Sequence, residues 1–117
     1  MKKPLRLLLV EDSKEDAELV LRELRRAFEV TFERVQTAED MTAALERTWD
    51  IIISDYSMPR FTGPEAYNLL TANGVDIPFI IASGTIGEEV AITTMKLGVS
   101  DYLLKGKLAR LVPAIQR

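Results

Sequence analysis

The apolar residues of this chain gather in five short runs, several of them continuous instead of alternating with polar residues. Short apolar runs bounded by polar or turn residues predict β-strands. They occupy residues 5–10, 30–35, 50–54, 77–83 and 101–104. Because continuous apolar strands are typical of a sheet covered on both faces, the pattern indicates a buried parallel sheet.

Between these strands, apolar residues recur at helical spacing. The first helix is expected after Ser13, a cap residue with Asp16 three positions further on. Its apolar series continues through residues 27–28, which are therefore assigned to the helix. The second helix is expected over residues 37–45.

Two further helices are predicted between the third and fifth strands. One contains the stretch TGPEAYNLL (62–70) and stops at residues 73–74, an Asn-Gly pair that commonly terminates helices. The next is expected to run from near Thr85 to Gly98. In this helix Glu88 lies in the reciprocal capping position, three residues after the expected cap.

The last helical pattern, KLARLVPAIQR (107–117), ends the chain. It places four apolar residues on one side: Leu108, Leu111, Val112 and Ile115. Pro113 either bends this helix or lies near its end. Five alternating strand-helix pairs predict an α/β fold with a doubly wound five-stranded parallel sheet. We expect the strand order 2-1-3-4-5 of a flavodoxin-like (βα)5 fold, in a single domain over residues 1–117.

Polar residues end most of the predicted strands. Glu11 and Asp12 follow the first strand, Asp55 follows the third, Ser83 ends the fourth, and Lys105 follows the fifth. Ligands of open parallel sheets bind beyond the carboxyl ends of the strands, where the strand order reverses. Since the first and third strands are neighbours there, we expect the three acids to share one pocket.

Three carboxylates in one pocket repel one another. At about 5 Å and an effective dielectric constant near 20, each pair costs about 3 kcal/mol. Lys105 offsets only one of these charges. An oxygen-only pocket of this kind suits Mg²⁺, with Mn²⁺ and Ca²⁺ as alternatives. A bound cation would attract a phosphoryl group, which Ser83 and Lys105 could contact. Asp55, which stands alone on its strand, is the expected nucleophile.

Composition excludes several other kinds of chemistry. The chain has no cysteine and no histidine, so it has neither thiol chemistry, nor a histidine-based triad, nor a phosphohistidine of its own. The net charge of -3 gives no reason to expect direct nucleic-acid binding. No apolar run is long enough to span a membrane, and we expect no membrane contact and a cytoplasmic location.

Four short motifs resemble the response regulator receiver (CheY-like) domain over essentially the whole chain. They are VEDS at 10–13, DYSMPRFTG at 55–63, ASGT at 82–85 and DYLLK at 101–105. Their order and spacing together are specific to that family. The stretches SGTIGEE and DYLLKGKLARL are also similar to receiver modules attached to hybrid or sensory histidine kinases.

The resemblance implies a phosphorelay signalling module. Asp55 would accept a phosphoryl group from the phosphohistidine of a sensor histidine kinase or phosphotransfer protein. Asp12, Asp55 and the carbonyl oxygen of Ser57 would bind Mg²⁺, and Glu11 would act partly through water. The domain would catalyse only its own phosphorylation and dephosphorylation, and would not be a turnover enzyme.

The resemblance also implies a switch. Ser83 and Lys105 would contact the phosphoryl group, and Tyr102 would rotate inward as Ser83 moves. This would reshape the face made by the fourth helix, the fifth strand and the fifth helix, which would signal to a downstream effector or a fused output domain. The family tunes the lifetime of the phosphorylated state at the positions of Ser57 and Thr85. Gly106 replaces the frequent proline, which leaves the Lys105-Gly106 conformation open.

Three other functions fit the sequence less well. A phosphatase of the haloacid dehalogenase type needs a second acid two residues after the nucleophile, where this chain has Ser57. A dinucleotide-binding domain needs glycines after the first strand, and none occurs there. The remaining alternative is a receiver-like interaction scaffold that is never phosphorylated. Whether the chain forms a homodimer is left open.

Overall fold

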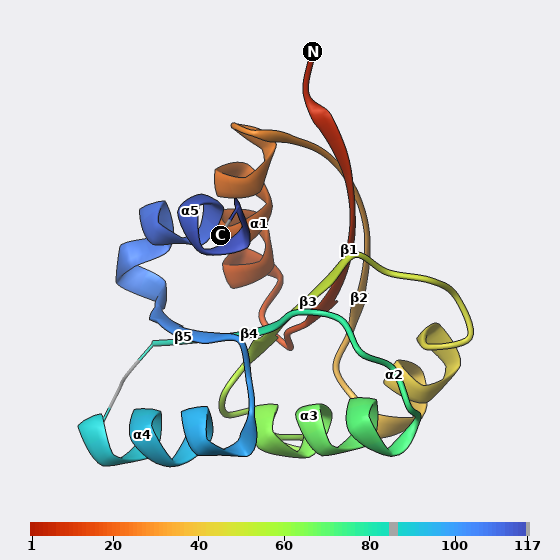
Figure 1. Ribbon diagram of the computed structural model, residues 1–117, viewed down its shortest axis with the longest axis vertical. Helices are drawn as coiled ribbons and strands as arrows, with labels where there is room; N and C mark the ends of the chain where they lie inside the picture. The colour runs from red at the N-terminus through yellow and green to blue at the C-terminus, as the bar shows by residue number, and fades with distance from the viewer. Residues whose placement is uncertain (85–86, 117) are drawn as a thin grey trace.

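The computed structural model describes residues 1–84 and 87–116, and its centre is one parallel sheet (Figure 1). The strand order is β2-β1-β3-β4-β5, as the sequence predicts. All four strand pairings are parallel. The strands are β1 (Lys3–Val10), β2 (Phe28–Val35), β3 (Ile51–Asp55), β4 (Phe79–Ser83) and β5 (Asp101–Leu104).

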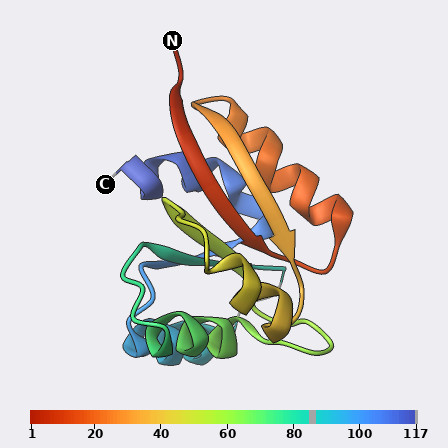
Figure 2. The ribbon, with the colours of Figure 1, turned by 90° about the vertical axis from the view of Figure 1, so that its right-hand side faces the viewer.

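Helices connect the strands and cover both faces of the sheet (Figures 1 and 2). They are α1 (Lys14–Arg25), α2 (Ala38–Ala44), α3 (Gly63–Ala72), α4 (Glu88–Leu97) and α5 (Leu111–Gln116), the last preceded by a 3₁₀ segment (Lys105–Arg110). Helices α1 and α5 lie on one face, and α2, α3 and α4 lie on the other. No helix in the described part of the chain is long and apolar enough to cross a membrane.

Two apolar clusters hold these layers together. Alternate residues of β1 point to opposite faces, so that Leu7 and Leu9 pack in the cluster under α1 and α5 while Leu8 and Val10 pack in the other. The strands β1, β3 and β4 are almost wholly buried near their carboxyl ends. This double covering explains why their apolar runs are continuous, as predicted.

The first helix is shorter than its apolar pattern. Helix α1 ends at Arg25, and Phe28 begins β2 opposite Lys3. The assignment of Ala27 and Phe28 to the helix was therefore wrong. Because Phe28 packs in the same cluster as the apolar face of α1, it continues that pattern while its backbone pairs with β1. Side-chain burial alone does not distinguish the two conformations.

The start of α4 also differs from its prediction. Gly87 is the cap of this helix and Glu88 is its first residue, so Glu88 does not occupy the reciprocal capping position. Thr85, the expected start, lies outside the described residues. The predicted end is confirmed, since Gly98 caps the helix with a φ of 113°, in the left-handed region that favours glycine.

The last predicted helix is divided in two. Residues of the 3₁₀ segment precede α5, and the non-helical φ and ψ of Lys107 interrupt the path. Pro113 is the third residue of α5, in a first turn where proline is tolerated. The break therefore lies before the proline and not at it. Lys105-Gly106 is a trans peptide bond, and it directly follows β5.

Candidate functional site

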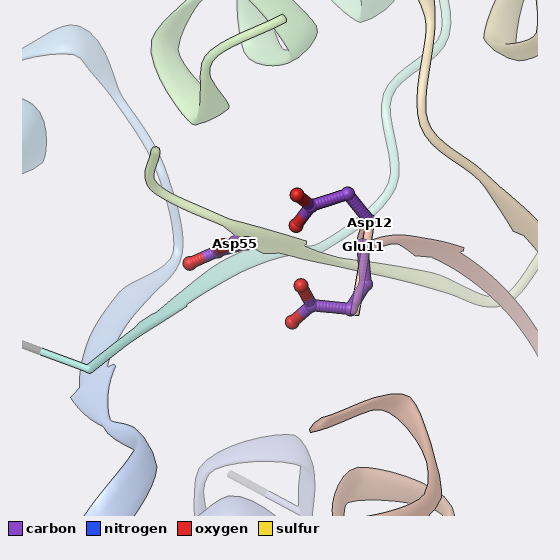
Figure 3. A group of neighbouring side chains, drawn as sticks. All are labelled: Glu11, Asp12 and Asp55. Carbon is purple, nitrogen blue, oxygen red and sulfur yellow. The ribbon is translucent and has the colours of Figure 1, made fainter. Parts of the chain in front are cut away.

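Three carboxylates meet at the carboxyl ends of β1 and β3 (Figure 3). The two strands are neighbours, and Val10 on β1 lies opposite Ser54 on β3. Glu11 and Asp12 directly follow the first of these residues, and Asp55 directly follows the second. One carboxylate oxygen from each acid lies within 4.8 Å of the others. The structure thus brings the three acids together where the sequence predicts.

The environments of the three acids are different. Glu11 is buried, with 2% of its surface exposed, whereas Asp12 next to it is exposed. The side chain of Asp55 is 11% exposed. Backbone groups orient two of them: Ser13 N donates to Glu11 Oε2 at 3.2 Å, and Tyr56 N donates to Asp55 Oδ1 at 2.8 Å. The pocket therefore contains a buried carboxylate, Glu11, and a solvent-exposed one, Asp12.

Burial changes the protonation of Glu11. Burial is the main cause that raises the pKa of this carboxyl group to about 7; the nearby Asp55 charge also raises it, and the hydrogen bond and charge of Lys105 lower it. A carboxyl group with a raised pKa holds its proton more readily than a free one. A cation placed between Glu11 and Asp55 would favour the ionised form of both.

Lys105 lies among the acids. Its Nζ atom is 2.6 Å from Asp16 Oδ2, 2.8 Å from Glu11 Oε1 and 3.4 Å from Asp55 Oδ1. Although burial works against the ammonium, hydrogen bonds to Asp16 and Glu11 raise the pKa of Lys105 above its usual value. The lysine is therefore charged at neutral pH and sits beside the predicted nucleophile.

Asp16 is a member of this site that sequence reasoning did not include. Its backbone N–H donates to Ser13 Oγ at 3.2 Å, which is the capping bond that the sequence predicts. Its side chain, however, pairs with Lys105. The signal was present, because Asp16 lies in the first turn of α1, which begins directly after the strand end that carries Glu11 and Asp12.

Arg34 is a second residue that the sequence did not indicate. Its Nη1 donates to the carbonyl oxygen of Glu11 at 3.0 Å, and it lies 3.5 Å from the carbonyl oxygen of Asp12. It comes from the neighbouring strand β2. The guanidinium therefore fixes the backbone that carries both acids, and it adds a positive charge behind them.

The loop after Asp55 is held by buried contacts. Met58 and Phe61 are both buried under the sheet, and Gly63 N donates to the carbonyl oxygen of Tyr56 at 2.8 Å. A Cβ atom at Gly63 would lie 2.8 Å from the carbonyl oxygen of Asp55, so the loop returns too close for any side chain. Ser57, between these anchors, is exposed. Its carbonyl is the ligand that the resemblance implies.

Ser83 and Tyr102 lie beside the acid pocket on the next two strands. Ser83 ends β4, is 5% exposed, and follows Ala82, which pairs with Asp55. The Tyr102 ring is 6.1 Å from that of Tyr56. Its buried hydroxyl makes no hydrogen bond of normal geometry within the described residues. Burial raises the pKa of this phenol, while the nearby Ser83 hydroxyl opposes the shift.

The donor set fits a hard divalent cation. The three clustered acids offer only oxygen ligands, and the chain has no histidine or cysteine to favour a softer metal. The Asp55 charge is one of the causes, after burial, that raise the pKa of Glu11. Because Asp12 is exposed, a cation could reach the group from solvent and keep some of its water, as Mg²⁺ prefers.

Comparisons with known proteins identify the family. The fold and the strand-end acids define a CheY-like α/β receiver. Residues 7–116 match the response regulator receiver domain, and the chain belongs to that family. It is a phosphorelay signalling module, since receiver domains are the signalling modules of two-component systems.

Individual relatives are distant but nearly full-length matches to this chain. It is 28% identical over 113 residues to the two-component response regulator ORR42 of Oryza sativa subsp. japonica, covering 86% of this chain and 85% of that protein. It is 31% identical over 113 residues to the transcriptional regulatory protein PrrA of Mycobacterium bovis. That match covers 95% of this chain but 48% of PrrA, so the chain spans about half of that relative.

A solved structure agrees with the fold. The Mn²⁺-bound form of response regulator Rcp1 superimposes with a TM-score of 0.78 at 25% sequence identity. The superposition covers 97% of this chain and 92% of that one. The sheet and helices described above are therefore those of a receiver domain throughout.

Proposed function

We propose that this domain accepts a phosphoryl group on Asp55 from the phosphohistidine of a partner protein, in a reaction that depends on Mg²⁺. The observation that carries the proposal is the meeting of three carboxylate oxygens within 4.8 Å, with a lysine 3.4 Å from Asp55 Oδ1. The metal ligands would be Glu11, Asp12, Asp55 and the carbonyl oxygen of Ser57.

In the proposed transfer, a carboxylate oxygen of Asp55 attacks the phosphorus atom of the donor. The new O–P bond forms as the P–N bond breaks, and the donor imidazole keeps the electron pair of that bond. Tyr56 N–H orients the Asp55 carboxylate through Oδ1. Lys105 supplies a positive charge to the transferred phosphoryl oxygens. Bound Mg²⁺ would supply further positive charge to the same oxygens and to the acids.

The signalling change is proposed to pass through Ser83 and Tyr102. Ser83 ends the strand beside Asp55, where its hydroxyl can approach a phosphoryl oxygen. Tyr102 would adjust with it, because its phenol is buried near the Ser83 hydroxyl. The affected surface would be the one formed by α4, β5 and α5.

The partners follow from the same proposal. The phosphoryl donor would be a sensor histidine kinase or a phosphotransfer protein. The signal would pass from this domain to a downstream effector or a fused output domain. The match to this chain covers only 48% of PrrA, which supports an output domain fused to the receiver domain. Mn²⁺ is a reasonable substitute for Mg²⁺, since the similar Rcp1 structure is a Mn²⁺-bound form.

The test is phosphorylation by a small-molecule donor. Wild-type protein incubated with Mg²⁺ and acetyl phosphate is expected to gain one phosphoryl group by intact mass spectrometry. Asp55→Asn, which keeps the shape of the side chain but removes the nucleophile, is expected to gain none. Wild type without Mg²⁺, in EDTA, serves as the second control. An unmodified wild type under all conditions would favour the unphosphorylated scaffold.

A further inference from the structure

Lys105 has two kinds of carboxylate neighbour. Glu11 and Asp55 belong to the group of acids that could hold a cation, and Asp16 does not. The contact to Asp16 is nevertheless the shortest of the three, at 2.6 Å compared with 2.8 Å and 3.4 Å. The ammonium thus lies closest to the acid that is outside the metal group.

The fold fixes Asp16 in this place. Ser13 caps α1, and the capping bond from Asp16 N sets the first turn of the helix. Helix α1 packs against the 3₁₀ segment that begins with Lys105. The two side chains therefore meet across the gap between α1 and the end of β5, although they are 89 positions apart in the sequence.

An ammonium and a divalent cation compete for the same carboxylates. If Lys105 were paired only with Glu11 and Asp55, its single positive charge would compete with a cation for two of the three acids. A third carboxylate on the α1 side offers the ammonium a partner that leaves this group available. The Asp16 side chain is 36% exposed, so its ion pair with Lys105 contributes little to the free energy of folding. The ion pair should instead affect cation binding at the acid group.

We propose that Asp16 is a positioning residue that draws Lys105 toward the α1 side of the pocket, so that the ammonium competes less with a divalent cation for Glu11 and Asp55. The proposal rests on the proposed function, since it assumes that this acid group binds Mg²⁺. It assigns Asp16 no contact with the metal or with the phosphoryl group. Asp16 acts only through the lysine.

The test is Mg²⁺ binding by isothermal titration calorimetry. Asp16→Asn is expected to raise the Mg²⁺ dissociation constant by about fivefold, because the ammonium that has lost Asp16 then pairs more strongly with Glu11 and Asp55. Glu15→Gln is the matched control. It removes one charge from the same helical turn, but Glu15 is exposed and forms no ion pair within the described residues, so its dissociation constant should stay near that of wild type. Asp16→Glu, which keeps the charge, should restore most of the affinity.

A double-mutant cycle shows whether Asp16 acts through Lys105. In a Lys105→Ala background, Asp16→Asn is expected to have no more effect on Mg²⁺ binding than Glu15→Gln has. An equal loss of affinity with and without the lysine would overturn the proposal, as would an Asp16→Asn variant that binds Mg²⁺ like wild type. In either case wild type would still bind Mg²⁺ and be phosphorylated, and the proposed function would stand. A wild type that binds no Mg²⁺ would overturn both.

Discussion

At the scale of single residues, neighbouring acids differ because of where the strand ends. Glu11 and Asp12 are adjacent in the chain, yet one is buried and the other exposed. Successive side chains at the end of a strand point to opposite sides, so one enters the space under α1 and the other faces the loops. Burial then raises the pKa of Glu11 to about 7. A carboxylate at position 11 and one at position 12 would therefore lie in different environments even if both were the same residue type.

Lys105→Ala tests the balance of charge at this scale. The ammonium lies 2.8 Å from Glu11 and 3.4 Å from Asp55, where it competes with a cation. Its removal is expected to leave Mg²⁺ binding unchanged or slightly tighter, by up to about threefold. Phosphorylation by acetyl phosphate should become slower in the same variant. Clearly weaker Mg²⁺ binding in calorimetry would contradict this arrangement of the site.

At the scale of elements, the capped ends of helices fix the limits of the loops around the site. Thr62 and Glu65 form a reciprocal capping box at the start of α3, with bonds of 3.0 Å and 3.2 Å, which ends the loop after Asp55. Gly98 ends α4 just before β5. Its φ is 113°, and a Cβ atom there would lie 2.6 Å from the Tyr67 hydroxyl. Tyr67 cannot easily move, since its ring packs edge-on against Phe79 at 5.3 Å.

Gly98→Ala and Gly74→Ala separate backbone strain from this steric contact. Gly74 also has a positive φ, 70°, but a Cβ atom there meets nothing within 4 Å. Gly74→Ala should therefore lower the free energy of unfolding by about 1 kcal/mol, the cost of the left-handed conformation. Gly98→Ala should lower it by about 2 kcal/mol or more. Urea unfolding measures the free energy of unfolding of both variants. Equal losses would show that the Tyr67 side chain moves aside at little cost.

At the scale of the whole molecule, the acid group is held in place by the sheet. The strands that carry it are buried on both faces, so the carboxylates cannot separate without disturbing both apolar clusters. Their repulsion is therefore a cost that the folded domain bears when no cation is bound. A cation that binds only the folded state would offset this cost, because its binding stabilises the folded state by mass action.

Asp12→Asn tests this cost. Asp12 forms no side-chain ion pair within the described residues, so its neutralisation removes mainly repulsion. In EDTA the variant is expected to be more stable than wild type by about 0.5 to 1 kcal/mol, and it should gain little from Mg²⁺. Asp76→Asn, an exposed acid in the loop before β4, makes the same change of net charge and should have neither effect. Thermal unfolding with and without Mg²⁺ measures both variants.

The sequence by itself determined the fold class and the members of the acid group. Apolar runs such as residues 50–54 and 77–83 record burial on both faces, and that burial is a property of each strand on its own. The acids follow because parallel strands end at one edge, so Glu11, Asp12 and Asp55 could be brought together from strand order alone. The cap at Ser13 is equally local, and it is confirmed.

Only the tertiary structure decided which groups pair across the site and where some elements begin. Lys105 meets Asp16 over 89 positions, and Arg34 reaches the Glu11 backbone from a neighbouring strand. Phe28 became a strand residue because β1 extends to Lys3 and offers its backbone a partner. A local pattern records whether a residue is buried. It does not record which distant group lies opposite, because that depends on how helices and strands pack together.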